Sequence, residues 1–329
     1  MTVRAVALLS GGLDSMLAIR ILQLQGIEVE ALNFRTKFAC CQSQAAQAAN
    51  ELGVKLSVLA ERDDYLEVVR APQHGYGRGA NPCVDCRIYM FRLAAQHMRD
   101  CGAAFVASGE IVGQRPMSQK KRDLALIAHR AGLTDHLLRP LCAKLLPPVL
   151  AEQQGLVDRE QLFGFSGRGR KELIALAQQF GFTRIPHPST GCALTEPQFG
   201  AKVHDLLLHA PAAGGWDFDL LKIGRHTRLD ERTKVVLGRR AEENAQLTRL
   251  FAEHPSEFNA LLTPENFQGP TALVVSTADA PDAEAIRRAG ELILRHTRSA
   301  PADPTAEVRR GAERTIERLQ PEAATATSV

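Results

Sequence analysis

The sequence predicts an α/β protein in which a doubly wound parallel sheet is followed by a smaller α+β domain. Apolar strand patterns alternate with helical patterns over residues 1–60, a glycine-rich turn follows the first strand, and the composition changes from Gly214 onward. Alternating βαβ units build a parallel sheet that binds its ligands beyond the carboxyl ends of its strands. With 329 residues, 45% of them hydrophobic, the chain can form more than one core.

The expected elements follow from apolar periodicity and from the glycines that end helices. The first strand is Ala5–Leu9, and the first helix is Asp14–Gln25, ended by Gly26. The next elements are a strand at 28–34, a helix at 42–52 ended by Gly53, a strand at 55–60, a helix at 88–99 and a core strand at 104–107. The first five of these elements form a βαβαβ unit, and the helix at 88–99 and the strand at 104–107 continue the alternation.

Prolines at 140, 147 and 148 mark the expected end of the sheet domain. Behind it we expect a helix at 170–180, strands at 218–223, 233–237 and 271–276, a helix at 241–253 and one exposed helix at 306–319. The predicted domains are 1–150 for the sheet, 151–213 for a helical connector, 214–300 for the small α+β domain and 301–329 for a flexible tail.

Composition narrows the class of protein. The chain has 40 basic and 37 acidic residues, a net charge of +3 that alone decides nothing about a nucleic-acid partner. The apolar run before the first glycines is too short for a signal peptide or a membrane span, so we expect a cytoplasmic protein with no membrane partner. Seven cysteines, an odd number that includes a C-x-x-C, favour metal or sulfur chemistry over a disulfide framework.

The turn Ser10–Ser15, SGGLDS, joins a strand to a helix, where backbone N–H groups can converge on phosphate oxygens. The chain contains neither G-x-x-x-x-G-K-[ST] nor G-x-G-x-x-G. SGGLDS resembles the PP-loop of enzymes that cleave ATP between the α and β phosphates, which implies an adenine nucleotide alpha hydrolase-like domain. The alternative is an ordinary strand-to-helix turn. The resemblance implies that ATP and Mg²⁺ bind through Ser10, Gly11, Gly12, Asp14 and Ser15, with the backbone of Phe34 near adenine.

Three cysteines have a suggestive spacing. Cys83 and Cys86 open a helix, whose N-terminus favours thiolates, and Cys192 follows in a loop of small residues 192 − 86 = 106 positions after Cys86. The arrangement resembles tRNA thiouridylases. In the 2-thiouridylases of that family an aspartate occupies the position of Cys83, so this chain is more similar to the iron–sulfur branch. That resemblance implies that Cys83, Cys86 and Cys192 hold a [4Fe–4S] cluster with one iron free for sulfide, and that they act with Asp14 in catalysis.

Two other readings of the cysteines remain open. In one, the cysteines carry a persulfide and cycle through a disulfide. In the other they bind zinc, which needs a fourth ligand such as His187.

Residues 108–119, SGEIVGQRPMSQ, resemble the G-E-x-x-G-Q-x-x-S-Q loop of 4-thiouridine synthetases. The resemblance implies contacts to ATP or the target base from Gly109, Gln114, Ser118 and Gln119. Basic residues suited to RNA phosphates follow at Lys120, Lys121, Arg168 and Arg170, although each group could be a solvated turn or helix start.

The segment 223–244 resembles a small accessory domain found behind some thiolase-type proteins and in ribosome-associated factors. RNA binding is implied there, with Arg225, Arg228, Arg239 and Arg240 as phosphate contacts. The whole pattern implies ATP-dependent tRNA thiolation, with tRNA and a sulfur donor, sulfide or a persulfide carrier, as partners. Rival functions are another PP-loop amidotransferase or ligase acting on tRNA, which would not need the cysteines, and a non-catalytic RNA-binding factor.

Overall fold

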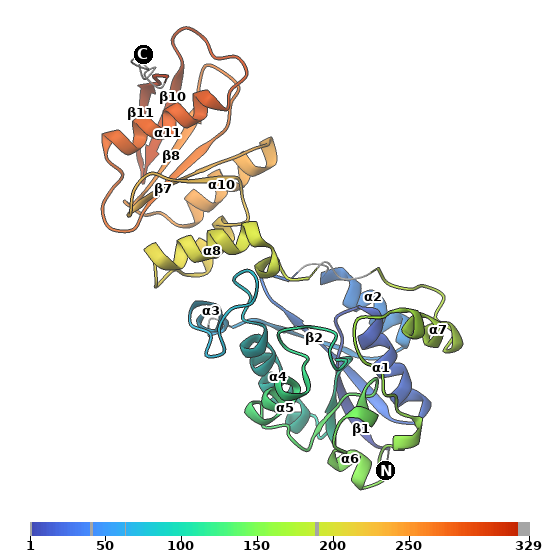
Figure 1. Ribbon diagram of the computed structural model, residues 1–329. Helices are drawn as coiled ribbons and strands as arrows, with labels where there is room; N and C mark the ends of the chain where they lie inside the picture. The colour runs from blue at the N-terminus through green and yellow to red at the C-terminus, as the bar shows by residue number, and fades with distance from the viewer. Residues whose placement is uncertain (1, 40–41, 63, 188–190, 322–329) are drawn as a thin grey trace, which may run out of the picture. The chain divides into compact units, whose positions relative to one another are not determined.

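The structure is a computed structural model that describes residues 2–39, 42–62, 64–187 and 191–321. The chain divides into two compact units, Met1–Gly200 and Ala201–Val329. Figure 1 colours the first from blue to yellow-green and the second from yellow to red. Among the described residues, no helix has the length and apolar character needed to cross a membrane.

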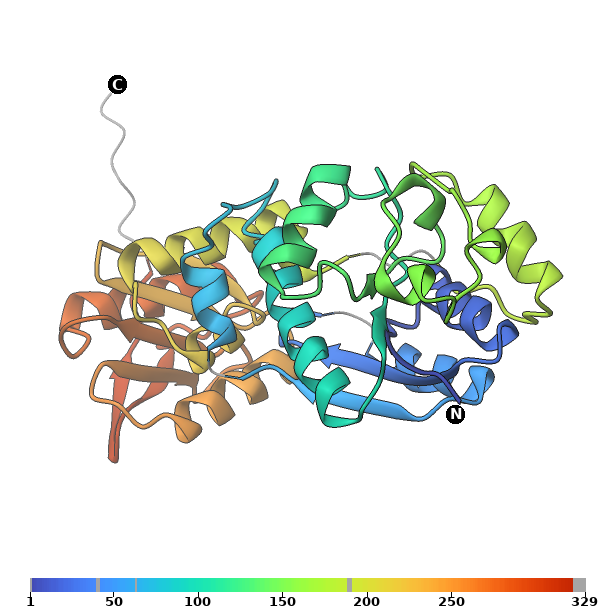
Figure 2. The ribbon, with the colours of Figure 1, turned by 90° about the horizontal axis from the view of Figure 1, so that it is seen from below.

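The first unit is built on a five-stranded parallel sheet in the order β3-β2-β1-β4-β5. Figure 2 shows its blue strands lying side by side. From β1 the chain moves outward to β3, and then returns to add β4 and β5 on the other side, which is the doubly wound arrangement. The predicted fold class is therefore confirmed. The strands are β1 (Arg4–Leu8), β2 (Glu28–Arg35), β3 (Leu56–Ala60), β4 (Phe105–Ala107) and β5 (Leu137–Leu138).

Helices cover both faces of this sheet, as Figure 1 shows. Apolar residues of α1, α2 and α7 pack with Ala5 and Ala7 on one face, and those of α4 and α5 pack with Val6 and Leu8 on the other. Alternate residues of β1 thus face opposite layers, because successive side chains of a strand point to opposite sides. The helices are α1 (Leu13–Leu24), α2 (Gln42–Leu52), α3 (Tyr65–Arg70), α4 (Cys83–Asp100), α5 (Lys121–Arg130), α6 (Leu150–Gln153) and α7 (Lys171–Gln179), with short 3₁₀ turns at Ala143–Leu145, Arg159–Gln161 and Ala193–Thr195.

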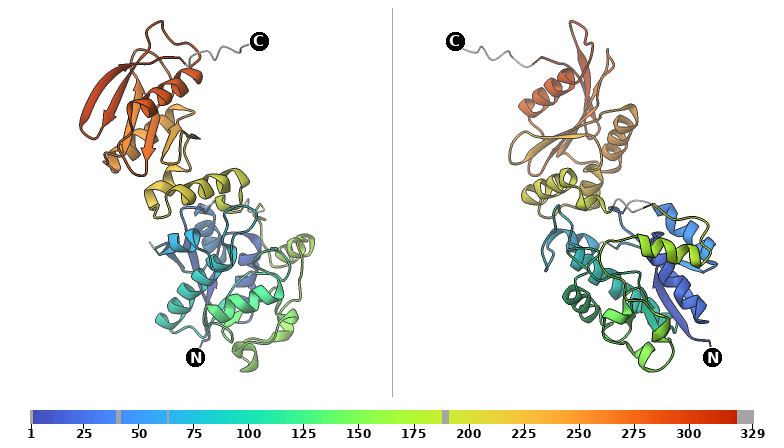
Figure 3. Two further views of the ribbon diagram at one scale, coloured as in Figure 1. Left: turned by 60° about the vertical axis from the view of Figure 1, so that its left-hand side comes forward. Right: turned by 45° about the vertical axis from the view of Figure 1, so that its right-hand side comes forward.

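The second unit has a six-stranded antiparallel sheet in the order β11-β10-β8-β9-β7-β6. Helix α11 packs on one face, and α9 and α10 pack on the other, as can be followed in Figure 3. The elements are α8 (Pro197–His209), which begins in the first unit, α9 (Gly215–Leu220), β6 (Arg225–Arg228), β7 (Thr233–Leu237), α10 (Ala241–Glu253), β8 (Asn259–Pro264), β9 (Ala272–Ser276), α11 (Ala283–Arg295), β10 (Thr305–Arg310) and β11 (Glu313–Arg318).

Two expected elements of the second unit are wrong. The predicted strand at 218–223 begins within helix α9, where Phe218 and Leu220 are buried. The predicted helix at 306–319 is a hairpin of β10 and β11, turned at Gly311 with a φ of +56°. Ala306 and Val308 are buried while their neighbours are more exposed, a period-two pattern that marks a strand.

Candidate functional site

The glycine turn lies between β1 and α1, at the carboxyl edge of the sheet. Gly11 has a φ of +83°, and a Cβ there would lie 2.6 Å from the carbonyl carbon of Gln44, so no other residue fits without displacement. The Ser15 hydroxyl donates to the carbonyl of Gly12 at 2.8 Å, and Ser10 accepts from the amide of Gly12 at 3.3 Å. The sequence-predicted phosphate residues therefore share one compact turn at a helix N-terminus.

The loop that follows β4 presses directly on this turn. A Cβ at Gly109 would lie 2.5 Å from the backbone carbon and oxygen of Asp14, so glycine permits the approach. The Gln114 amide donates to the Asp14 carboxylate at 2.9 Å. Two segments that lie about a hundred residues apart in the sequence thus meet at Asp14.

The end of the same loop is buried. Ser118 is 4% and Gln119 is 3% exposed, and the Gln119 amide oxygen has no hydrogen-bond partner among the described residues. A buried acceptor left unpaired is costly, which marks this end of the loop as a strained part of the site. Lys120 and Lys121, which come next, are exposed.

Cys83 and Cys86 occupy the first turn of α4, so the helix starts earlier than the sequence predicted. The Asn81 amide donates to the Cys83 sulfur at 3.1 Å. The Cys86 sulfur lies 3.3 Å from the Tyr65 hydroxyl and 3.9 Å from the sulfur of Met90. The Cys83 thiol is therefore in contact with an amide, and the Cys86 thiol with a phenol hydroxyl and a thioether.

The loop of Cys192 is brought to the same place, although Ser189 and Thr190 lie outside the described residues. Cys192 forms a β-bridge with Ala39, and the amide of Ala80 donates to the carbonyl of Leu194 at 3.0 Å. A Cβ at Gly79 would lie 2.5 Å from that carbonyl. The fold therefore brings the loop of the third cysteine against the segment that leads into the other two. His187, the suggested fourth zinc ligand, is exposed.

Burial changes the expected acidity of this site. The pKa of Cys86 is raised because burial disfavours the thiolate, although the hydrogen bond from Tyr65 opposes the effect. The expectation of a lowered thiol pKa is therefore wrong for Cys86. The pKa of Tyr65 is raised well above its usual range by burial and then by its interactions with Cys86 and, more weakly, with Cys192.

Phe34 packs its ring near the cysteines. It makes edge contacts with Tyr65 at 6.0 Å and with Tyr89 at 5.7 Å between ring centroids. Its backbone is paired with Leu59 of β3. An aromatic cluster therefore separates the end of β2 from the start of α4.

Sequence reasoning missed a buried ion pair that supports the loop after β4. Glu110 is 3% and Arg139 is 5% exposed, and the Arg139 guanidinium donates to the Glu110 carboxylate at 2.9 Å. Arg87, next to Cys86, lies 3.7 Å from the other carboxylate oxygen. No sequence signal links these positions, because they are far apart in the chain. The Arg139 pair fixes Glu110, and Arg87 ties the same carboxylate to the cysteine helix α4.

The basic residues of the first unit differ in their surroundings. Arg168 is exposed in a loop whose Gly167 amide donates to the carbonyl of Val112. Arg170 is half-buried and donates to the carbonyl of Pro186 at 2.9 Å. Arg168 therefore lies on a loop that is attached to the loop after β4.

The four arginines of the second unit do not form one cluster. Arg225 at the start of β6 pairs with Leu237, close to Arg239 and Arg240, whereas Arg228 lies three residues along the strand, about 10 Å away. Arg228 makes a bidentate ion pair with Asp205, and Arg239 makes one with Glu243. Arg225 and Arg240 are exposed, and neither has an ion pair among the described residues.

Lys234 is a second feature that the sequence did not reveal. It is 5% exposed, and its ammonium nitrogen has no hydrogen-bond partner among the described residues. Burial lowers the pKa of Lys234 to about 8. It lines a cavity of about 390 Å³ together with Arg228, Arg232, Ser276 and Thr277. Burying an ammonium without an acceptor is costly, and the carboxylates of Asp217, which also lines the cavity, and Asp205 only partly offset this cost.

Comparison with known proteins gives each unit a separate match. Residues 3–131 match the family model described as the tRNA methyl transferase HUP domain. Residues 224–328 match the NFACT protein RNA binding domain. The tRNA-specific 2-thiouridylase MnmA of Methylobacterium nodulans is 32% identical over 138 residues, and that of Nitrobacter hamburgensis is 30% identical over 142. These alignments cover 37% and 38% of this chain.

The chain spans only 36% of the length of these two relatives. Two solved structures share limited likeness. A 4-thiouridine synthetase–RNA complex with bound ATP has a TM-score of 0.38 at 20% identity, covering 66% of this chain and 53% of that one. A predicted subunit of tRNA methyltransferase from Methanocaldococcus jannaschii has a TM-score of 0.39 at 18% identity, covering 62% and 86%. The resemblance of the first unit to tRNA thiolases is confirmed by its similarity to these two 2-thiouridylases.

Proposed function

We propose that this protein is an ATP-dependent tRNA thiolase that adenylates a uridine carbonyl and replaces its oxygen with sulfur. One observation carries the proposal. The loop 108–119 contacts Asp14 through Gly109 and Gln114, and it also reaches the cysteine helix, where the sulfur of Met117 lies 3.6 Å from the Asn81 amide. A single loop therefore joins a phosphate turn to the start of a two-cysteine helix.

The residues of the first unit fit ATP. Gly11 lets the turn pack against α2, because a Cβ there would lie 2.6 Å from the backbone of Gln44, and this packing holds the amides of the turn at the start of α1. Backbone amides at the N-terminus of α1 favour the pyrophosphate, and the Asp14 carboxylate would hold Mg²⁺. These groups offset the charge that grows on the leaving pyrophosphate.

The reaction divides into two displacements. The uridine carbonyl oxygen attacks the α-phosphorus, the bond between the α and β phosphates breaks, and pyrophosphate leaves. A sulfur nucleophile then attacks the activated carbon, and AMP leaves with the former carbonyl oxygen. Gln114 orients the Asp14 carboxylate in the first step. The buried Glu110–Arg139 pair fixes the loop that carries Gln114.

We further propose that the three cysteines hold a [4Fe–4S] cluster and not a single zinc ion. The proposal is supported by the loop of Cys192, which lies against the segment that leads into Cys83 and Cys86, so that three thiolates can approach one another. Cys83, Cys86 and Cys192 would hold the cluster, and the Asn81 amide already donates to one of the sulfurs. When bound, such a cluster supplies an open iron that can carry sulfide.

RNA contact is assigned to exposed cations of both units. In the first unit these are Lys120, Lys121 and Arg168, with Arg170 as a partly buried neighbour. In the second they are Arg225 and Arg240, and Lys234 offers its ammonium to a phosphate that enters its cavity. Arg228 and Arg239 are held by carboxylates and would chiefly shape the surface.

The products of ATP turnover test this function. Turnover with tRNA should release AMP and pyrophosphate, because the phosphate turn lacks a P-loop lysine. Asp14→Asn should lower turnover strongly while leaving tRNA affinity nearly unchanged, and the exposed Asp135→Asn is the matched control. ADP as the main product would contradict the proposal. Release of AMP at the normal rate, without incorporation of sulfur into the RNA, would indicate a PP-loop amidotransferase or ligase that acts on tRNA.

A further inference from the structure

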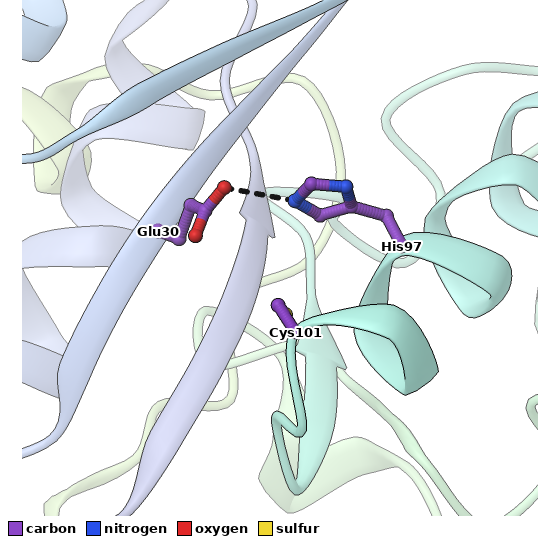
Figure 4. A group of neighbouring side chains, drawn as sticks. All are labelled: Glu30, His97 and Cys101. Atoms are coloured by element: carbon purple, nitrogen blue, oxygen red, sulfur yellow. Dashed lines mark hydrogen bonds and ion pairs between the residues drawn. The ribbon is translucent and has the colours of Figure 1, made fainter.

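Glu30, His97 and Cys101 form a mixed cluster between β2 and the end of α4 (Figure 4). Glu30 lies near the start of β2, His97 lies near the end of α4, and Cys101 is the residue that ends this helix. His97 follows Cys86 by 97 − 86 = 11 residues, so the two are about 16 Å apart along the helix. The cluster is therefore distinct from the three-cysteine site.

The donor atoms of this cluster converge. One carboxylate oxygen, one imidazole nitrogen and one sulfur all lie within 4.8 Å of one another. We propose that Glu30, His97 and Cys101 bind a divalent transition-metal ion, with Zn²⁺ as the fitting ion. Imidazole, thiolate and carboxylate are the ligands that zinc takes, and three protein ligands leave a fourth position for water.

A hydrogen-bonded network without metal would explain only part of this arrangement. The Glu30 carboxylate lies 2.8 Å from the His97 Nε2, and it accepts from Ser57 at 2.7 Å and from Lys55 at 3.2 Å. The Cys101 sulfur, however, has no hydrogen bond to Glu30 or His97 among the described residues. Its only one there is a long contact of 3.6 Å to the Met98 carbonyl. The hydrogen-bonded network would form without the Cys101 sulfur, whereas a soft metal ion would use this sulfur as a ligand.

Metal binding requires little rearrangement. The ion would take the place of the hydrogen between Glu30 and His97, which passes through solvent to Nδ1 of His97, and the Cys101 thiol would release its proton to solvent. Ser57 would remain hydrogen-bonded to the ligating carboxylate and orient it. The Lys55 side chain is 73% exposed, so its ammonium can stay on the second carboxylate oxygen or turn to solvent. His97 and Cys101 are partly exposed, which gives the ion a way in.

Cobalt spectroscopy can separate this site from the other cysteines. The full chain is prepared without oxygen with Cys83, Cys86 and Cys192 replaced by alanine, and Co²⁺ and then Zn²⁺ are titrated. One equivalent of Co²⁺ should produce a cobalt–thiolate charge-transfer band that Zn²⁺ abolishes. Cys101→Ser should remove the band, and Ser57→Ala should weaken Co²⁺ binding about tenfold. His136, which is partly exposed like His97, provides the control variant His136→Ala for His97→Ala.

The outcomes are distinct from those of the thiolase proposal, because the chain in this test lacks the three cysteines. Loss of the band in Cys101→Ser and of affinity in His97→Ala, with His136→Ala unchanged and all variants folded by circular dichroism, supports the site. Zn²⁺ should also raise the thermal midpoint of the parent and not of Cys101→Ser. Failure to bind Co²⁺, or a band that survives Cys101→Ser, would overturn the proposal.

Discussion

Replacing Lys234 by methionine is expected to stabilise the second unit. Burial lowers the pKa of Lys234 from 10.5 to about 8, a difference of 2.5 pH units. At about 1.36 kcal/mol per unit, the buried ammonium costs about 3 kcal/mol at neutral pH. Lys234→Met keeps most of the side-chain volume and removes this cost, so the free energy of unfolding should rise by about 3 kcal/mol at pH 7.

The size of the effect changes with pH in a defined window. Below pH 8 the amine is protonated in both states, and the full cost is present. Between pH 8 and 10.5 the folded state loses its proton first, so the wild type gains stability as the pH rises. Above pH 10.5 the amine is neutral in both states. The difference between wild type and Lys234→Met should therefore be largest at pH 7 and small near pH 10.5.

Trp216 makes this measurement specific to one unit. It is the only tryptophan of the chain, and it lies in α9 of the second unit, where its indole donates to the Leu250 carbonyl. Its fluorescence in urea therefore follows the unfolding of this unit. Lys222→Met is the control, because Lys222 is exposed and makes a surface ion pair with Asp219 that contributes little.

The RNA affinity of Lys234→Met should fall while its free energy of unfolding rises. If Lys234 serves a phosphate, Lys234→Met weakens RNA affinity and lowers the salt slope by about one, even though the protein is more stable. A variant that is no more stable than the wild type would refute the electrostatic reasoning. A variant that is more stable but binds RNA equally well would remove Lys234 from the RNA surface.

Four further predictions use other parts of the molecule. Gly11→Ala should destabilise the first unit more than Gly26→Ala in thermal melts, since both have positive φ but only the former meets backbone within 3 Å. Glu110→Gln should cost about 3–5 kcal/mol in urea unfolding, because it strands a buried guanidinium, and the double variant with Arg139→Met should recover part of the loss. Hydrogen bonds and charge from Arg239 lower the pKa of Glu243 to about 2; the resulting stability is present above pH 4.5, so Glu243→Gln should be less stable there, with the difference fading as the pH falls to 2. Arg225→Ala and Arg240→Ala should each flatten the salt dependence of RNA binding by about one unit in a filter assay, while Arg249→Ala, whose arginine pairs with Glu253, should not.

The first sheet could be predicted from the sequence because local signals agree there. Buried runs such as Ala5–Leu8 are followed by helices that end at Gly26 and Gly53, and the structure places β1, α1, β2 and α2 within a few residues of the expected bounds. In the second unit the strands are short and their register is set by partners far along the chain. Phe218 and Leu220 are buried in a helix that is too short to show a helical period.

The site could be predicted only where its residues share a motif. The segments Ser10–Ser15 and 108–119 were identifiable because each follows a core strand. Cys83 and Cys86 are neighbours in sequence. The Glu110–Arg139 pair, Tyr65 beside Cys86 and the buried Lys234 could not be predicted, because their environments arise from packing between distant elements.

Nucleoside mass spectrometry of tRNA, after anaerobic incubation with the protein, ATP and sulfide, tests the proposed function most directly. A tRNA thiolase should yield a uridine in which one oxygen is replaced by sulfur, formed together with AMP. If the three cysteines hold a cluster, Cys83→Ala, Cys86→Ala and Cys192→Ala should each abolish this nucleoside and the brown colour of the iron-loaded protein. Thiolation by colourless, iron-free protein with a persulfide on Cys192 would contradict the cluster. An RNA left without sulfur by fully iron-loaded protein would contradict the proposed function itself.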